Sequence, residues 1–160
     1  MSFGSIRVTP THYASEDDPG YVVVGQGVVD EFSWTLALAK LGPDIGCSFF
    51  LDGSNGGYGS ADVAPARPPP GRKIGCRMGG NRYLVGWLDH AVIAVEAEAQ
   101  SGEIVRLPVL GERMDLVVNF FAVPIPQHEQ LVIVRALGPE DSVLDSTDAS
   151  AFMRWGGSGR

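Results

Sequence analysis

The segment EFSWTLALA (Glu31–Ala39) alternates between apolar side chains and polar or small ones along its whole length. The apolar face holds Phe32, Trp34, Leu36 and Leu38, and the other face holds Glu31, Ser33, Thr35 and Ala37. Successive side chains of a β-strand point to opposite faces, so this period of two is typical of a strand with one buried face. The segment therefore predicts a strand that packs on a core through its tryptophan and leucines.

A second apolar run differs because both of its faces are hydrophobic. Residues 116–123 are apolar apart from Asn119, which is typical of a strand covered on both sides. Shorter apolar runs recur along the chain between turns, which agrees with its 21 glycines and 11 prolines. We therefore expect an all-β sandwich of about eight or nine short antiparallel strands.

The chain is expected to form one domain with two extensions. Residues 1–19 predict an edge strand and an acidic loop, residues 20–145 the sandwich, and residues 146–160 a tail. The tail favours a short helix over residues 146–155, in which Phe152 and Trp155 share one face. We expect this aromatic pair to be covered by the sandwich itself, by a second copy of the chain or by a partner.

Residues 52–72 form the longest stretch without a strand pattern. The first half is rich in Gly, Ser and Asn and the second half in Pro, which predicts a long irregular loop. Tyr58 in this loop could stack on a sugar or anchor a protein. Asp52, Asn55 and Asp62 could chelate a hard cation, although a solvated loop is the simpler interpretation and no metal site is predicted.

The two cysteines, Cys47 and Cys76, flank this loop. The strands that carry them could pair across it, so we expect the two side chains to lie close together. In a reducing compartment both would be free thiols. In an oxidising one they could form a disulfide.

No residue pattern indicates catalysis. The histidines, His12, His90 and His128, are far apart in the sequence, and Asp89 and His90 are neighbours that a strand would point to opposite faces. The chain has no Gly-x-Ser-x-Gly nucleophile motif. The pair Gly25 and Gly27 lacks the third glycine and the helix of a dinucleotide-binding loop. We therefore predict no catalytic residue and no cofactor.

The charge argues against some partners. The formal net charge of −7 at pH 7 repels phosphate backbones, so we expect no nucleic-acid partner. No apolar run is long enough for a membrane span, and the first residues lack the pattern of a signal peptide. These features favour a cytoplasmic protein.

Several features together resemble small β-sandwich modules of unknown function that recur in actinobacterial proteins. The resemblance covers roughly residues 20–137. The matching features are Gly27 with Trp34 and Leu36, the cysteines Cys47 and Cys76 around a Gly-rich loop, the step from Tyr83 to Gly86, a Val-rich hairpin through Gly102, and Phe120-Phe121 before Pro124. The resemblance implies a β-sandwich and supplies no catalytic residues.

Three hypotheses about function follow. The first is a non-catalytic binding module whose partner is a protein or a second copy of the chain, since sandwiches present loops and edges for binding. The second is binding of a small ligand or carbohydrate through the loop 52–72. The third is an enzyme whose site the sequence pattern does not show. A protein partner predicts an exposed apolar face or an unpaired edge strand.

Overall fold

The computed structural model describes residues 6–16, 18–53, 56–64, 69–79 and 82–149, with the backbone alone for residues 56–64. These residues form an all-β sandwich in which every strand pair is antiparallel. Two short 3₁₀ helices, Glu112–Met114 and Pro139–Asp141, lie in connections. The expected fold class is therefore confirmed.

The described strands form three sheets. Sheet A has the order β1 (Arg7–Ala14), β2 (Val22–Val29), β3 (Phe32–Leu41), β4 (Asp44–Gly53), β5 (Gly56–Ala64). Sheet B has the order β10 (Asn119–Pro124), β7 (Tyr83–Leu88), β6 (Ile74–Gly79). Sheet C has the order β12 (Val143–Asp148), β11 (Leu131–Leu137), β8 (Ala94–Ala99), β9 (Ile104–Pro108).

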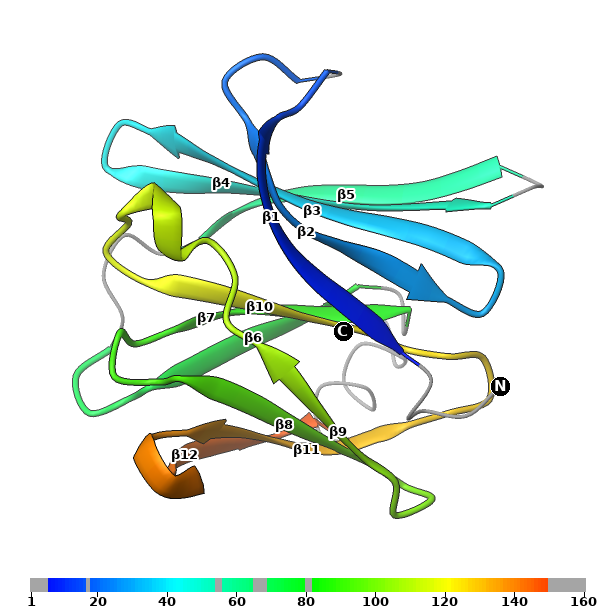
Figure 1. Ribbon diagram of the computed structural model, residues 1–160, viewed down its shortest axis with the longest axis vertical. Coiled ribbons are helices and arrows are strands. Elements are labelled where there is room, and N and C mark those ends of the chain that lie inside the picture. The colour runs from blue at the N-terminus through cyan, green and yellow to red at the C-terminus, as the bar shows by residue number, and fades with distance from the viewer. Residues whose placement is uncertain (1–5, 17, 54–55, 65–68, 80–81, 150–160) are drawn as a thin grey trace.

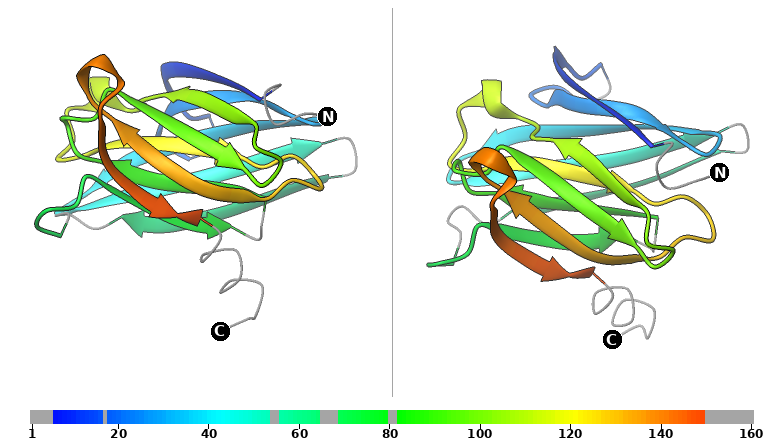
Figure 2. Two further views of the ribbon diagram at one scale, coloured as in Figure 1. Left: turned by 90° about the horizontal axis from the view of Figure 1, so that it is seen from below. Right: turned by 60° about the horizontal axis from the view of Figure 1, so that its bottom comes forward.

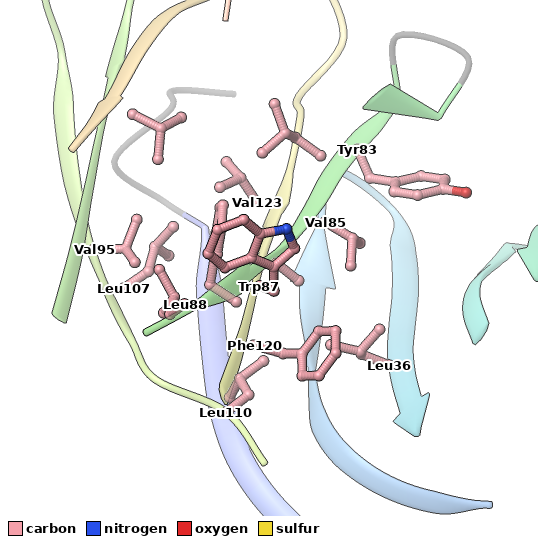
Figure 3. Packing of buried hydrophobic residues seen from close by; sticks show 14 of the residues in the cluster. Leu36, Tyr83, Val85, Trp87, Leu88, Val95, Leu107, Leu110, Phe120 and Val123 are labelled. Carbon is pink, nitrogen blue, oxygen red and sulfur yellow. The ribbon is translucent and has the colours of Figure 1, made fainter. Parts of the chain in front are cut away.

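Sheet B is the middle layer of the molecule, between sheets A and C (Figure 1). Every residue of β7 and of β10 is buried. Tyr83 points to sheet A, where its ring stacks on Phe49 with 3.9 Å between centroids. Phe120 points toward Leu36 of sheet A, whereas Leu88 points to the side of Val95 and Leu107 in sheet C (Figure 3). The prediction of a strand covered on both faces within residues 116–123 is thus confirmed.

Strand β3 places its apolar face as the alternation predicted. Trp34, Leu36 and Leu38 are buried, and Trp34 stacks on Phe49 with 5.5 Å between ring centroids. On the other face Ser33 is exposed and Thr35 is half-buried, whereas Ala37 and Ala39 further along the strand are buried. This face is the outer surface of sheet A.

The expected irregular loop over residues 52–72 is wrong for residues 52–53 and 56–64, which are strand, whereas residues 69–72 are irregular as expected. Residues 56–64 form β5, which pairs with β4 in an unbroken register from Ile45↔Ala64 to Gly53↔Gly56. Glycine and serine favour turns over strands, so composition suggested a loop. The neighbouring strand overrides this preference, because β4 offers a full row of backbone partners and only two residues connect the strands.

The helix expected from residue 146 is also wrong over its first residues. Ser146 to Asp148 lie in β12, where they pair with β11. The boundary placed after residue 145 therefore falls inside a strand, and the sandwich extends at least through Asp148. Ala149, the last described residue, has a helical backbone, and residues 150–155 with Phe152 and Trp155 lie outside the described residues. The two strands missed entirely, β5 and β12, help explain why the structure has more strands than the eight or nine expected.

At the other end of the chain, residues 7–14 form the expected edge strand. Strand β1 pairs with β2 alone within sheet A, with a bulge between Pro10 and Tyr13. It continues to Ala14, whereas the sequence pattern predicts a strand over Ser5–Thr9. None of the helices in the described part of the chain has the length and apolar character needed to cross a membrane.

Candidate functional site

No disulfide joins the two cysteines. Cys47 pairs with Leu38 of β3 and is buried with the face of sheet A that covers sheet B. Cys76 pairs with Gly86 of β7 and interacts with Thr147 of β12, so it lies on the side of sheet B that faces sheet C. The register therefore places Cys47 between sheets A and B and Cys76 between sheets B and C. It does not support the expectation that the two side chains lie close together.

The Cys76 thiol is poorly suited to nucleophilic chemistry. Burial raises the pKa of Cys76 to about 12, although the hydrogen bond with Thr147 and the charge of Arg72 act in the opposite direction. A thiol must be deprotonated to attack an electrophile. At neutral pH Cys76 is protonated, so it serves as a small packing residue between β6 and β12.

Asp89 and His90 make separate structural contacts at the turn after β7. The Asp89 carboxylate accepts a hydrogen bond from the backbone N–H of Ala91 at 3.0 Å and lies 3.6 Å from the Lys73 ammonium. The His90 Nε2 lies 2.8 Å from the carbonyl oxygen of Leu116, within hydrogen-bonding distance. These contacts fix the turn and the connection before β10.

The residues considered for cation binding are spread along the β4–β5 hairpin. Asp52 pairs with Gly57, whereas Asp62 pairs with Cys47, five residues further along β4. At the rise of a strand this separation is about 17 Å, too long for two ligands of one ion. No cluster of three or more metal-ligating side chains occurs in the described part of the chain. Asn55 lies outside the described residues.

The outer face of sheet C is occupied by ion pairs. Arg135 on β11 contacts Glu96 and Glu98 on the neighbouring β8, with its Nη1 3.0 Å from Glu96 Oε1. Arg106 on β9 reaches Asp141 at 2.7 Å. Arg106, Arg135, Glu96 and Glu98 thus each have a counter-ion within the same sheet or its connections. Such a face is typical of a solvated surface.

The outer face of sheet A is different because one complete cross-strand row of it, from Thr9 on β1 to Gly59 on β5, has no charged residue. The register places Gln26, Thr35 and Phe50 in this row, and in the next row Val28 and Ser33 lie between Arg7 and Asp52. Phe50 is 46% exposed and Val28 is 50% exposed. Tyr13, 46% exposed, belongs to the same face, since its hydroxyl donates to Gln26 Oε1 at 2.7 Å. We call the residues Tyr13, Gln26, Val28, Thr35 and Phe50 the outer patch.

Sequence reasoning missed the outer patch. The signal that could have revealed it is the doublet Phe49-Phe50, since adjacent residues of a strand point to opposite faces and only one of them can enter the core. Tyr58, the aromatic residue chosen instead, lies on β5, where it pairs with Leu51 of β4 rather than lying in an irregular loop. Phe152 and Trp155 lie outside the described residues, so the structure does not bring them to this site.

The chain was also compared with known proteins. No protein-family model, curated protein or solved structure matches it.

Proposed function

We propose that this domain is a protein-interaction module that binds its partner on the outer patch of sheet A. The observation that carries the proposal is the exposure of Tyr13, Val28 and Phe50 on one sheet face, where the row through Gln26, Thr35 and Phe50 has no charged residue and Arg7 and Asp52 flank the next row. Aromatic side chains are enriched at protein interfaces, and charged residues are depleted from the centres of interfaces. The ion-paired outer face of sheet C lacks both properties.

The rigidity of the face supports binding as well. Its side chains stand on paired strands, and the inner face of β3 and β4 is anchored by Trp34 and Phe49 in the core. A fixed backbone keeps the outer patch in one arrangement, which lowers the entropy that binding would cost. The hydrogen bond from Tyr13 to Gln26 also restrains the tyrosine ring.

Site-specific photo-crosslinking in the native host tests the proposal. A photoreactive phenylalanine analogue replaces Phe50 in one variant and Ile93 in the other. Ile93 is a matched control because it is 53% exposed and lies before β8 of sheet C, away from the outer patch. We expect discrete crosslinked protein species from position 50 and none from position 93. Equal crosslinking from both positions, or none from position 50, contradicts the proposal.

A further inference from the structure

Within the described part of the chain, strand β5 is an edge strand that lacks the contacts with other sheets that the edge strands β1, β10 and β12 make. Strand β1 contacts β9, β12 contacts β6, and β10 contacts β9. Leu110, just beyond β9, also forms a bridge with Phe120 of β10. Among the described elements, β5 makes extensive contacts with β4 alone. Figure 1 shows β5 at the margin of sheet A, and Figure 2 shows the same margin from two further directions.

The two edges of sheet A also differ in the features that prevent strand addition. Strand β1 contains Pro10, which has no N–H to donate, and a bulge follows it. Strand β5 spans nine residues with no proline and no register shift, and its sequence GGYGSADVA has one charged residue. Proline, bulges and charge are the usual protection of an exposed edge. Strand β5 has almost none of them.

The register indicates which residues of β5 turn their backbone groups to the open edge. Gly53 and Gly56 are the last pair before a two-residue connection, so they form the hydrogen-bonded pair that closes the hairpin. Hydrogen-bonded and non-hydrogen-bonded pairs then alternate along an antiparallel ladder. Gly59 and Ala61 fall on the non-bonded positions, where the N–H and C=O groups point away from β4.

The charge around this edge selects the kind of strand that can pair with it. Strands β4 and β5 with their connection, residues 44–64, contain Asp44, Asp52 and Asp62 but no lysine or arginine, and the basic residues nearest in sequence are Lys40 and Arg67. Asp44 and Asp52 are exposed on β4. A second copy of β5 would bring a further Asp62 and another acidic hairpin to the same edge, within a protein of net charge −7. A strand that carries lysine or arginine gains attraction instead.

We propose that β5 binds an extended segment of a partner protein, bearing lysine or arginine, as a sixth strand of sheet A. Main-chain hydrogen bonds to the outward groups around Gly59 and Ala61 supply the affinity, and the aspartates select a basic sequence. This inference rests on the proposed interaction function and names the chemistry of the partner. The added strand would lie beside the outer patch on the same sheet.

Two substitutions at one position test the strand addition. Ala61→Pro removes an outward N–H while leaving the hydrogen bonds to β4 intact, because position 61 is a non-bonded position. Ala61→Val retains the N–H and favours a strand, so it is the matched control. The probe is the peptide Lys-Thr-Val-Thr-Val-Thr-Lys with blocked ends and a fluorophore, and its counterpart has glutamate in place of both lysines.

Fluorescence anisotropy at low salt gives the affinities. We expect the lysine peptide to bind the unmodified protein and Ala61→Val alike, and to bind Ala61→Pro about tenfold or more weakly. The glutamate peptide should bind weakly, and added salt should weaken the lysine peptide. Circular dichroism and thermal unfolding of Ala61→Pro check that the sandwich remains folded. If Ala61→Pro proves unfolded, the affinities of the two peptides are measured with Asp62→Asn instead. This measurement tests the charge selection alone.

Several results would overturn the inference. They are failure of the lysine peptide to bind, equal binding to folded Ala61→Pro, or equal affinity for the lysine and glutamate peptides. A concentration-dependent dimer that Ala61→Pro abolishes would identify a second copy as the occupant and would also overturn it. Crosslinking from position 50 separates this inference from the proposed function. If crosslinks from position 50 persist in Ala61→Pro, the domain is an interaction module but does not bind its partner through β5. If position 50 gives no crosslinks at all, both the proposed function and this inference are contradicted.

Discussion

Strands β7 and β4 are both rich in large apolar residues, but the molecule covers them to different extents. Both faces of β7 are buried, because sheets A and C enclose sheet B. On β4 the inward residues Phe49 and Leu51 are buried, while the outward Phe50 is nearly half exposed. The comparison separates two uses of apolar residues. In sheet B they supply stability, and on the outer face of sheet A they are available for binding.

The largest expected effect is in the middle layer. Phe121 of β10 is completely buried. Replacing it with alanine removes a full aromatic ring and leaves a cavity between two sheets, so Phe121→Ala should lower the free energy of unfolding by about 3–5 kcal/mol. Urea denaturation followed by tryptophan fluorescence measures the loss. A loss below about 1 kcal/mol would show that sheet B is not the enclosed layer.

A smaller but still large effect is expected from adding one methyl group to the same layer. A Cβ atom built on Gly86 would lie 2.1 Å from the backbone oxygen of Gly75 on β6. Gly86→Ala must therefore separate β6 from β7 or displace Phe121, and should cost about 1–3 kcal/mol. Gly25→Ala is the matched substitution in sheet A, because the atoms nearest to its Cβ would all belong to the Leu110 side chain rather than to a backbone. Thermal unfolding should show the smaller loss for Gly25→Ala.

The strands that could be predicted from the sequence are those whose hydrophobic pattern alone determines their structure. The alternation of Trp34, Leu36 and Leu38 and the continuous apolar run of β10 both reflect burial, and burial decided both strands. Strand β5 could not be predicted in this way, because its glycines favour a turn and only pairing with β4 makes it a strand. The same holds for β12, whose polar residues pair with β11.

The candidate site was harder to predict because exposure depends on tertiary structure. A sequence shows that Phe49 and Phe50 point in opposite directions, but not which face a second sheet covers. Tyr13 and Phe50 belong to strands far apart in the sequence, and only the order β1 to β5 places them on one surface. The open edge could not be inferred either, since it depends on which strand ends the sheet.

A moderate, pH-dependent effect is expected where β12 meets the segment before β6. Burial alone would raise the pKa of Asp145, but hydrogen bonds from the backbone of Lys73 and Ser146 and the Arg72 guanidinium lower it below its ordinary value. A lowered pKa in the folded state stabilises the protein above the ordinary carboxyl pKa of about 4, and this stability is lost as the pH falls through the folded value.

The substitution Asp145→Asn removes this charge. It should lower the free energy of unfolding by about 1–2 kcal/mol at pH 7, since it weakens charge-assisted hydrogen bonds. The difference between Asp145→Asn and the unmodified protein should shrink below about pH 4. Urea midpoints at pH 7 and pH 3 measure it, with Asp18→Asn in the exposed β1–β2 connection as the control. A difference independent of pH would show that packing, rather than charge, stabilises this contact.

The smallest effect on stability is expected at the outer patch. Phe50 is half exposed and its partner on β5 is Gly59, which has no side chain to pack against it. Phe50→Ser should therefore change the free energy of unfolding by less than about 1 kcal/mol, far less than Phe121→Ala. Ile93→Ser, at a similarly exposed position, should be equally mild.

The two mild substitutions should nevertheless differ in binding. A photoreactive residue at Thr35, which pairs with Phe50 in the outer patch, reports on the partner in both backgrounds. We expect Phe50→Ser to reduce crosslinking from position 35 and Ile93→Ser to leave it unchanged, because an aromatic side chain at the centre of an interface often carries much of the binding energy. A large loss of stability in Phe50→Ser would mean that Phe50 belongs to the core. Unchanged crosslinking in a stable Phe50→Ser variant would mean that the partner does not depend on Phe50.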